Sequence, residues 1–417
     1  MEIDQIYQLF IASKGLSTDT RNINKGQLFF ALKGDNFNGN EYAAQALKDG
    51  ASFSIIDEEK YNTSDHIILV DDVLKTLQDL AHFHREQFDI PVIGITGTNG
   101  KTTTKELIHA ALSTQYNVHY TKGNFNNHIG VPLTLLAMKS DTQIAIIEMG
   151  ANHIGEIETL CNIANPNYGI ITNCGKAHIE GFGSEENIKI AKGELYKHIK
   201  NKDGQLFVNN HLDYLMQMSD GIKRTEYQNL EVLISSPKLK LKSAVEMEVQ
   251  LIGRYNIPNI SAAYAIAKFF DISEEKIKSG LESYIPAGLN RSELRDYKGA
   301  TIILDAYNAN PSSMKVALES FNEEAYNSKM VILGDMFELG ETSNKEHQNI
   351  LVKLSELSFD GKVVVGENFN CNNCDEDIIA FKSTYELKAW FDTLDIEGLS
   401  ILIKGSRGMK LESILES

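Results

Sequence analysis

The chain has 417 residues, of which 42% are hydrophobic and 23% are charged, and its formal net charge is −17. Two or three domains are expected at this length, and the acidic balance argues against nucleic acid as the main partner, although a basic cleft for a small anion is compatible with it. The sequence contains no apolar run that could span a bilayer and no signal-peptide pattern, so a protein of the cytoplasm is expected. A monomer is expected as well, although the sequence does not determine the oligomeric state.

The first block, residues 1–85, is predicted to be a small α/β domain. Strand-like runs occupy residues 27–32, 52–56 and 67–70. A helical pattern at residues 42–48 separates the first two runs and closes at Asp49-Gly50, a plausible helix end.

Two further blocks alternate strands and helices, which predicts mostly parallel sheets. In residues 86–290, strands are expected at 92–95, 143–148 and 168–172, with a helix from about Thr102. In residues 291–417, a Rossmann-like domain is expected, with strands at 301–305, 330–333, 362–365 and 399–403. Residues 205–250 contain strand-like pieces without a chemical motif. The CxxC formed by Cys371 and Cys374 is interpreted as a surface loop rather than a metal or redox site.

Residues 94–104 read GITGTNGKTTT and follow a predicted strand. Gly97 and Gly100 would let backbone N–H groups converge on phosphate oxygens at a helix N-terminus. Lys101 would reach the β- and γ-phosphates, and the Thr102 hydroxyl would bind Mg²⁺. The common P-loop pattern has a glycine where Ile95 stands, so the alternative is a strand–helix turn without a ligand. Because the loop lies between a strand and a helix, nucleotide binding is favoured.

Three more residues are candidates for this site or stand near it. Glu148 ends a strongly apolar strand, where a buried carboxylate is costly unless it meets a cation, so an Mg²⁺ role is favoured over a solvated strand end. His178 follows the next strand on the same rim. Lys192, on a predicted helix, is indistinguishable from a solvated lysine by pattern alone.

The third block carries its polar clusters at strand ends, as a binding rim should. They are the runs 305–314 (DAYNANPSSM), 334–340 (GDMFELG) and 403–407 (IKGSR). Asn-Pro within the first run is also ordinary turn chemistry. These patterns indicate a binding surface without identifying its ligand.

Taken together, these motifs resemble those of the Mur ligase family, ATP-dependent enzymes that form amide bonds in peptidoglycan synthesis, over essentially the full length. TGTNGKT at 96–102 is similar to that family's own P-loop, which accounts for Ile95. The resemblance implies two Mg²⁺ ions and a carbamate on Lys192 that would make this lysine a metal ligand. The implied metal ligands are Thr102, Glu148, His178 and Lys192. The implied ATP-binding residues are Gly97, Thr98, Asn99, Gly100, Lys101, Thr102, Thr103, Asn259, Arg291 and Tyr307. The implied catalytic residues are Lys101, Lys192, His178 and Asp305.

A second family motif reads GRYNIPN at 253–259. Here Tyr255 replaces the family's histidine, so no proton-handling role is carried over, and Asn259 is expected near the adenine of ATP. Arg291 resembles an arginine at the domain junction that reaches the phosphates, and Asp305 and Tyr307 are expected beside ATP.

The branch of the family is indicated by YNANP at 307–311, together with TKGNFNNHIG at 121–130 and GDMFELG at 334–340. These forms are similar to the branch that adds D-alanyl-D-alanine to a UDP-MurNAc-tripeptide, whose third residue the sequence does not specify. The implied UDP-substrate residues are Thr20, Arg21, Lys33, Gly34, Asn124, Asn126 and Asn127. The implied residues on the D-Ala-D-Ala side are Asn308, Asn310, Ser313 and Asp335. Asn38-Gly-Asn40 departs from the family's Asp-Gly-His at one substrate-contact position.

Three rival interpretations stay open. Another amide-ligase branch, or folylpolyglutamate synthesis, would use the same ATP chemistry. A P-loop ATPase that drives movement or binding would release phosphate without a peptide substrate. A nucleotide-binding scaffold without catalysis would leave the acidic and basic strand-end residues unexplained.

Overall fold

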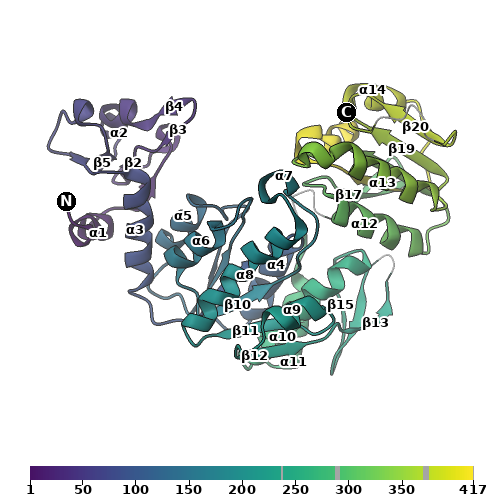
Figure 1. The fold of residues 1–417 in the computed structure, drawn as a ribbon, viewed down its shortest axis with the longest axis horizontal. Coiled ribbons are helices and arrows are strands. Elements are labelled where there is room, and N and C mark those ends of the chain that lie inside the picture. Colours follow the sequence, from purple (N-terminus) through teal and green to yellow (C-terminus); the bar gives the residue numbers. More distant parts are fainter. Residues whose placement is uncertain (236–237, 287–291, 370–374, 417) are drawn as a thin grey trace.

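The computed structural model describes residues 1–235, 238–286, 292–369 and 375–416, which form three α/β bodies arranged in chain order (Figure 1). Arg291, Cys371 and Cys374, for which the sequence made predictions, lie outside these described residues. The strands of each sheet fall within one of the three predicted segments, while the exact boundaries after residues 85 and 290 stay predictions. The three-domain α/β prediction is confirmed.

The N-terminal body is built on a four-stranded parallel sheet of order β1-β2-β5-β6. Its strands are β1 (Leu16–Ser17), β2 (Leu28–Phe30), β5 (Phe53–Ile56) and β6 (Ile67–Leu69), and a small hairpin adds β3 (Lys33–Gly34) and β4 (Phe37–Asn38). Its helices are α1 (Ile3–Ala12) and α2 (Ala43–Lys48). The three predicted strands and the predicted helix are confirmed, each to within about two residues, whereas α1 was not predicted.

Helix α3 (Val73–Arg85) connects this body to the next one and packs against both. Asp72 starts the helix, because its side chain accepts a hydrogen bond from the Lys75 backbone N–H at 2.8 Å. The buried face of α3 joins one continuous apolar cluster that extends from Ile6 and Phe30 to the central sheet. The N-terminal and central bodies therefore share a core.

The central body contains a six-stranded sheet of order β12-β11-β10-β7-β9-β8, parallel throughout. The strands are β7 (Val92–Thr96), β8 (Val118–Tyr120), β9 (Ile144–Glu148), β10 (Tyr168–Ile171), β11 (Gln205–Asn209) and β12 (Arg224–Tyr227). Strands β7, β9 and β11 are buried at every position, as expected for a sheet covered on both faces.

Helices cover both faces of the central sheet. One face carries α5 (Gly130–Leu136), α6 (Glu156–Ala164), α7 (Ile179–Phe182), α8 (Glu185–Asn201) and α9 (Asp213–Met218). The other carries α4 (Lys101–Leu112), α10 (Ile257–Phe269) and α11 (Glu274–Ser283). A small antiparallel sheet of β13 (Glu231–Ile234), β14 (Lys240–Lys242) and β15 (Glu246–Glu248) accounts for part of the region that the sequence left without a motif.

The C-terminal body has a second six-stranded sheet, of order β16-β17-β21-β18-β19-β20. Its strands are β16 (Glu293–Tyr297), β17 (Ala300–Asp305), β18 (Lys329–Gly334), β19 (Gly361–Val365), β20 (Ile378–Phe381) and β21 (Ser400–Lys404). The edge strand β16 runs antiparallel, and the other pairings are parallel. Helices α12 (Pro311–Glu323) and α13 (Ser343–Ser355) pack on one face and α14 (Thr384–Phe391) on the other.

Short 3₁₀ helices occupy several connections. They are η1 (Thr20–Asn22), η2 (Gly39–Tyr42), η3 (Glu59–Tyr61), η4 (Arg254–Asn256), η5 (Gly340–Thr342), η6 (Arg407–Met409) and η7 (Leu411–Leu415). Within the described ranges, no helix combines the length and the apolar character that crossing a membrane requires.

Candidate active site

The glycine-rich loop connects β7 to α4, as predicted. Gly97 and Gly100 have φ angles of +146° and +80°, values that L side chains rarely adopt. A Cβ at Gly97 would lie 2.0 Å from Thr172 Oγ1, and one at Gly100 would lie 2.4 Å from Asn259 Oδ1. Both glycines are therefore required by close packing as well as by backbone conformation. Lys101 Nζ donates to the carbonyl oxygens of Gly97 at 2.6 Å and Thr98 at 3.1 Å.

Ile95 belongs to the strand and not to the turn. Its side chain is 0% exposed within the apolar cluster beneath α4 and α10. An apolar residue at this position completes the core, and the tight turn begins only at Gly97. The departure from the common P-loop pattern is explained by where the strand ends.

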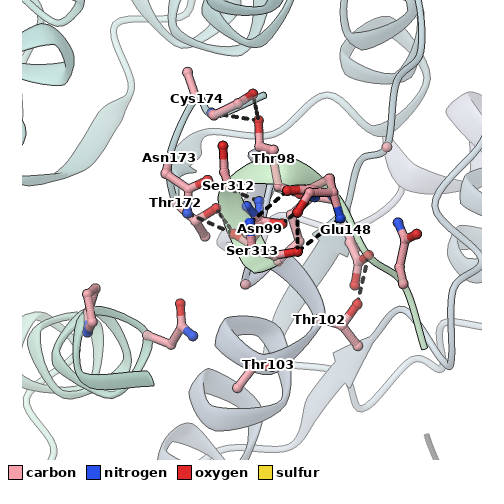
Figure 2. Close-up of a pocket in the computed structure, with 18 of the residues that line it drawn as sticks. Thr98, Asn99, Thr102, Thr103, Glu148, Thr172, Asn173, Cys174, Ser312 and Ser313 are labelled. Carbon is pink, nitrogen blue, oxygen red and sulfur yellow. Dashed lines mark hydrogen bonds between the residues drawn. The ribbon is translucent and has the colours of Figure 1, made fainter. Parts of the chain in front are cut away.

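Glu148 ends β9 and is directly paired with Ile95 across the sheet. Its side chain is 1% exposed, and Oε1 accepts a hydrogen bond from Thr102 Oγ1 at 3.1 Å (Figure 2). The same oxygen also accepts one from Asn126 Nδ2 at 2.8 Å. Oε2 is buried without a hydrogen-bond partner among the described residues, and Lys105 Nζ lies 3.4 Å from it in an ion pair. A hard cation at this carboxylate would satisfy an oxygen that now lacks a hydrogen bond, so Thr102 and Glu148 fit Mg²⁺.

His178 and Lys192 lie near the same edge of the sheet, at the carboxyl ends of its strands. His178 has φ +51° at the start of α7, and its Nδ1 forms an ion pair with Glu338 of the C-terminal body. Burial lowers the pKa of His178, with the Glu338 carboxylate acting in the opposite direction. Within the described residues, no group of three or more His, Cys, Asp and Glu side chains forms a complete metal cluster.

Lys192 is buried on α8 and does not lie on a solvated face. It is 2% exposed, its Nζ donates to Ala151 O at 3.4 Å, and the ammonium lies 5.2 Å from the centroid of the Phe182 ring. Burial, followed by the charge of Lys101, lowers the pKa of Lys192 to about 7. A substantial uncharged fraction at neutral pH is therefore expected for this amine.

The glycine-rich loop, Glu148 and His178 line a cavity of about 990 Å³ between the central and C-terminal bodies. Asn310 Nδ2 donates to Asn99 Oδ1 at 2.8 Å, and Lys176 N donates to Ser312 Oγ at 2.8 Å, so α12 lies directly against the glycine loop. Figure 2 shows Ser312 and Ser313 beside Asn99 and Thr98. The C-terminal body therefore closes over the loop.

Most of the predicted site residues meet in this cavity. Those that line it are Thr98, Asn99, Gly100, Lys101, Thr102, Thr103, Asn124, Asn126, Asn127, Glu148, His178, Asn259, Asp305, Tyr307, Asn308, Asn310 and Ser313. Gly97 and Lys192 adjoin the lining without forming part of it. Arg291 lies outside the described residues.

Family models match three stretches of the chain. They are described as "Mur ligase family, catalytic domain" at residues 13–85, "Mur ligase middle domain" at 95–267 and "Mur ligase, glutamate ligase domain" at 290–392. The UDP-N-acetylmuramoyl-tripeptide–D-alanyl-D-alanine ligase of Bacillus subtilis (strain 168) is 36% identical over 422 residues, covering 96% of this chain and 92% of the relative. The chain belongs to the Mur ligase family.

Solved structures agree with this assignment over nearly the whole chain. MurF from Acinetobacter baumannii has a TM-score of 0.88 and 29% identity, covering 99% of this chain and 97% of that one. MurF from Thermotoga maritima, solved in complex with ADP, has a TM-score of 0.86 and 26% identity, covering 98% and 97%. The family prediction is confirmed, whereas the ligand-binding role of each residue stays a prediction.

The predicted UDP-substrate residues of this Mur ligase fall into two groups. Asn124, Asn126 and Asn127 line the cavity, but Thr20, Arg21, Lys33 and Gly34 lie on the N-terminal body, away from the cavity lining. Lys33 Nζ is 2.9 Å from Asp57 Oδ1. Asn38 and Asn40, which replace the family's Asp and His, donate to Glu58 and Asp57, each at 2.9 Å. The altered motif is therefore held by the acidic pair that also faces Lys33.

Asp335 differs from the other residues predicted on the D-Ala-D-Ala side. It is 3% exposed and is not part of the cavity lining. Its carboxylate accepts hydrogen bonds from the backbone N–H groups of Asn368 and Phe369, each at 3.2 Å. The Asp335 side chain therefore stabilises the loop after β19 within the C-terminal body.

Several residues that line the cavity had no role assigned from the sequence. Lys404 lies in the run 403–407, which was predicted as part of the binding rim, but no function was assigned to it. It ends β21 and is 2% exposed, and its Nζ lies 2.5 Å from Asp305 Oδ2. Asn209, His211, Tyr214 and Asn229 come from the region that the sequence left without chemistry. The polar run Asn209-Asn-His211, which begins at the last residue of the buried strand β11, was the available signal, because it repeats the strand-end pattern of Glu148.

Proposed function

We propose that this chain is an ATP-dependent ligase that joins D-alanyl-D-alanine to the terminal carboxylate of UDP-MurNAc-tripeptide in peptidoglycan precursor synthesis. The observation that carries this proposal is 36% identity over nearly the full length to a ligase of that name. The cavity supports it, because it combines a phosphate loop with a second wall from the C-terminal body. The enzyme is expected to act as a cytoplasmic monomer.

In the proposed reaction, a carboxylate oxygen of the tripeptide attacks the γ-phosphorus of ATP, and the bond to the ADP oxygen breaks. The amine of D-Ala-D-Ala then attacks the carbonyl carbon of the acyl phosphate. The tetrahedral intermediate expels inorganic phosphate, and the amine nitrogen loses a proton as the amide forms. The products are UDP-MurNAc-pentapeptide, ADP and phosphate.

The chain's own residues have distinct parts in this proposal. Lys101 exchanges its contacts with the Gly97 and Thr98 carbonyls for the phosphates, where its charge offsets repulsion between two anionic reactants. Asn259 is assigned to the adenine end of ATP, and Asp305 and Tyr307 are assigned to the ATP side of the C-terminal body; all three line the cavity. Asn308, Asn310 and Ser313 lie on the side assigned to the dipeptide. Contacts such as Asn310–Asn99 keep water from the acyl phosphate.

Thr102 and Glu148 would hold one Mg²⁺, and His178 with a carbamate on Lys192 would hold a second. When bound, Mg²⁺ would supply positive charge that stabilises the anionic phosphoryl group during transfer. The burial of Lys192 supports the carbamate, because only an uncharged amine adds to carbon dioxide, and burial lowers the pKa of this lysine to about 7. The fit of Glu148 rests on its buried Oε2, which lacks a hydrogen-bond partner among the described residues.

Phosphate release tests the proposal when ATP, UDP-MurNAc-tripeptide and D-Ala-D-Ala are omitted in turn. Stoichiometric release of phosphate and appearance of the pentapeptide are expected only with all three present, and chelation of Mg²⁺ should abolish both. Equal release without peptide substrates would favour the ATPase interpretation. Activity with a different amine, but not with D-Ala-D-Ala, would favour another branch of the family.

A further inference from the structure

Lys105 is a fully buried lysine one turn after Lys101 on α4. Its side chain is 0% exposed, although the spacing of the helix sequence gave no indication of this. Burial of an ammonium group is costly unless nearby acceptors and opposite charges offset the lost hydration. The neighbours of this side chain should therefore reveal why it is buried.

The ammonium of Lys105 faces two different parts of the candidate site. Its Nζ donates to Gly123 O at 3.0 Å and lies 3.4 Å from Glu148 Oε2. Glu106 Oε1, on the neighbouring residue, lies 3.3 Å away. The two carboxylate oxygens of Glu148 thus have different partners. Oε1 accepts two hydrogen bonds from neutral groups, and Oε2 faces the ammonium of Lys105.

We propose that Lys105 is a positioning residue that serves as the counter-ion of Glu148 while the nucleotide is absent and makes Mg²⁺ uptake dependent on the nucleotide. This inference rests on the Mg²⁺ role proposed for Glu148. A cation that binds the carboxylate is repelled by an ammonium 3.4 Å from the same oxygen. Mg²⁺ therefore binds weakly until ATP supplies phosphate oxygens as additional ligands. Lys105 in this way prevents the empty site from trapping free metal.

The same side chain ties the metal site to the segment 121–127. Gly123 belongs to this segment, the Glu148 backbone N–H donates to Thr121 Oγ1 at 3.0 Å, and Asn126 donates to Glu148 Oε1. Asn124, Asn126 and Asn127 of the segment line the cavity on the side assigned to the UDP substrate. A change at the carboxylate is therefore transmitted to the substrate segment through direct contacts.

The test compares thermal unfolding of the wild-type enzyme and Lys105→Met while Mg²⁺ is titrated, first without nucleotide and then at a saturating concentration of ADP. Methionine retains the length of the stem and removes the charge. Lys105→Met should unfold at least about 5 °C lower without Mg²⁺, because Glu148 loses its counter-ion. Without nucleotide, Mg²⁺ should stabilise the variant at a concentration at least about tenfold lower than the wild type requires. Equal Mg²⁺ responses of the two proteins would overturn the proposal.

Lys122→Met is the matched control. Lys122 is an exposed lysine whose Nζ lies 3.6 Å from the centroid of the Tyr120 ring, and Lys105 lies 5.8 Å from the same ring. The control loses the same charge and a cation–π contact, and it should keep the wild-type response to Mg²⁺. A response of Lys122→Met equal to that of Lys105→Met would show a general charge effect and overturn the assignment to Lys105.

A double variant covers the case in which Lys105→Met does not fold. Lys105→Met/Glu148→Gln removes both charges of the pair, so it should fold and regain most of the lost unfolding temperature. If both variants fail to fold, Lys105 acts through packing and the proposal is wrong. If the wild-type enzyme ligates, Lys105→Met should have a KM for UDP-MurNAc-tripeptide several-fold higher than the wild type. Its KM for D-Ala-D-Ala should be unchanged. Equal changes in both KM values would also count against the proposal.

The outcome is separable from that of the proposed ligase function. If the wild-type enzyme ligates normally and Lys105→Met responds to Mg²⁺ as the wild type does, only the role of Lys105 is refuted. If the wild-type enzyme does not ligate but Lys105→Met gains a nucleotide-independent response to Mg²⁺, only the ligase proposal is refuted.

Discussion

Gly175 lies on the central body where α12 of the C-terminal body approaches it. A Cβ at this position would lie 2.9 Å from Ser312 Oγ and 3.2 Å from Ser312 Cβ, and its next neighbour, Thr98 Cγ2, would be in ordinary contact at 3.7 Å. The methyl group added by Gly175→Ala therefore collides with Ser312 of the C-terminal body, whereas the central body, to which Gly175 belongs, has room for it. Ser312 Oγ also accepts the Lys176 backbone N–H at 2.8 Å, so a displacement of Ser312 weakens this hydrogen bond.

The closed arrangement should be destabilised by about 1–3 kcal/mol, from overpacking and the weakened hydrogen bond. If catalysis requires closure, this corresponds to a decrease of about 5- to 150-fold in kcat/KM, measured by phosphate release with all three substrates. The unfolding temperature should remain within about 2 °C of the wild-type value, because neither body is altered internally.

The double variant Gly175→Ala/Ser312→Gly removes the opposing side chain and should recover at least half of the lost activity on a logarithmic scale. Wild-type kcat/KM for Gly175→Ala would refute the requirement for this closed interface. An activity loss in Gly175→Ala that the second substitution does not relieve would place the defect in the central body and not at the interface.

Three further predictions concern lysines that line or adjoin the cavity. Lys101→Ala should lower ligation at least about 10³-fold without changing the unfolding temperature by more than a few degrees, as phosphate release and thermal unfolding would report; substantial retained activity would remove the loop from catalysis. In metal-free buffer without carbon dioxide, the stability of the wild type relative to Lys192→Met should rise between about pH 7 and pH 10.5, by up to about 1.4 kcal/mol per pH unit in denaturant titrations. The sign follows because the unfolded state binds the proton of Lys192 throughout this range and the folded state does not, so a pH-independent difference would contradict the lowered pKa. Lys404→Met should destabilise the C-terminal body by about 3–5 kcal/mol and raise the KM for ATP, because Asp305 loses the ammonium 2.5 Å away; Lys404→Met/Asp305→Asn should regain stability but not the KM.

Local sequence was sufficient for the parts of the site that a single connection determines. The glycine turn follows β7 directly, and its two positive φ angles require the residues that the motif supplies. The position of Glu148 beside the glycine turn could be predicted, because a parallel strand buried on both faces brings its last residue to the ligand-binding edge of the sheet. Strands β7, β9 and β10 of the central sheet and β17, β18, β19 and β21 of the C-terminal sheet were predicted for the same reason, since continuous apolar runs mark them. The remaining strands, β8, β11, β12, β16 and β20, were not individually predicted.

Features that depend on distant packing could not be predicted from local patterns. Lys105 and Lys192 occupy helix positions like those of solvated lysines, and only the elements packed over them bury their side chains. Asp335 follows a strand as a rim residue should, but backbone N–H groups from residues 368 and 369 turn its carboxylate inward. The antiparallel direction of β16 carries no signal in its own short, half-exposed sequence.

The continuous apolar cluster that runs through α3 has a consequence for how the chain acquires its structure. It joins residues from Ile6 to Leu215, whereas the two clusters of the C-terminal body draw on residues 300–414, with Ile252 as their single buried member from the described part of the central body. Residues 1–286 should therefore fold as one cooperative unit during synthesis, before the last third of the chain leaves the ribosome. The final third should then fold on its own core and attach through mainly polar contacts. Separation of the two bodies would therefore expose few buried apolar side chains, with Ile252 among them.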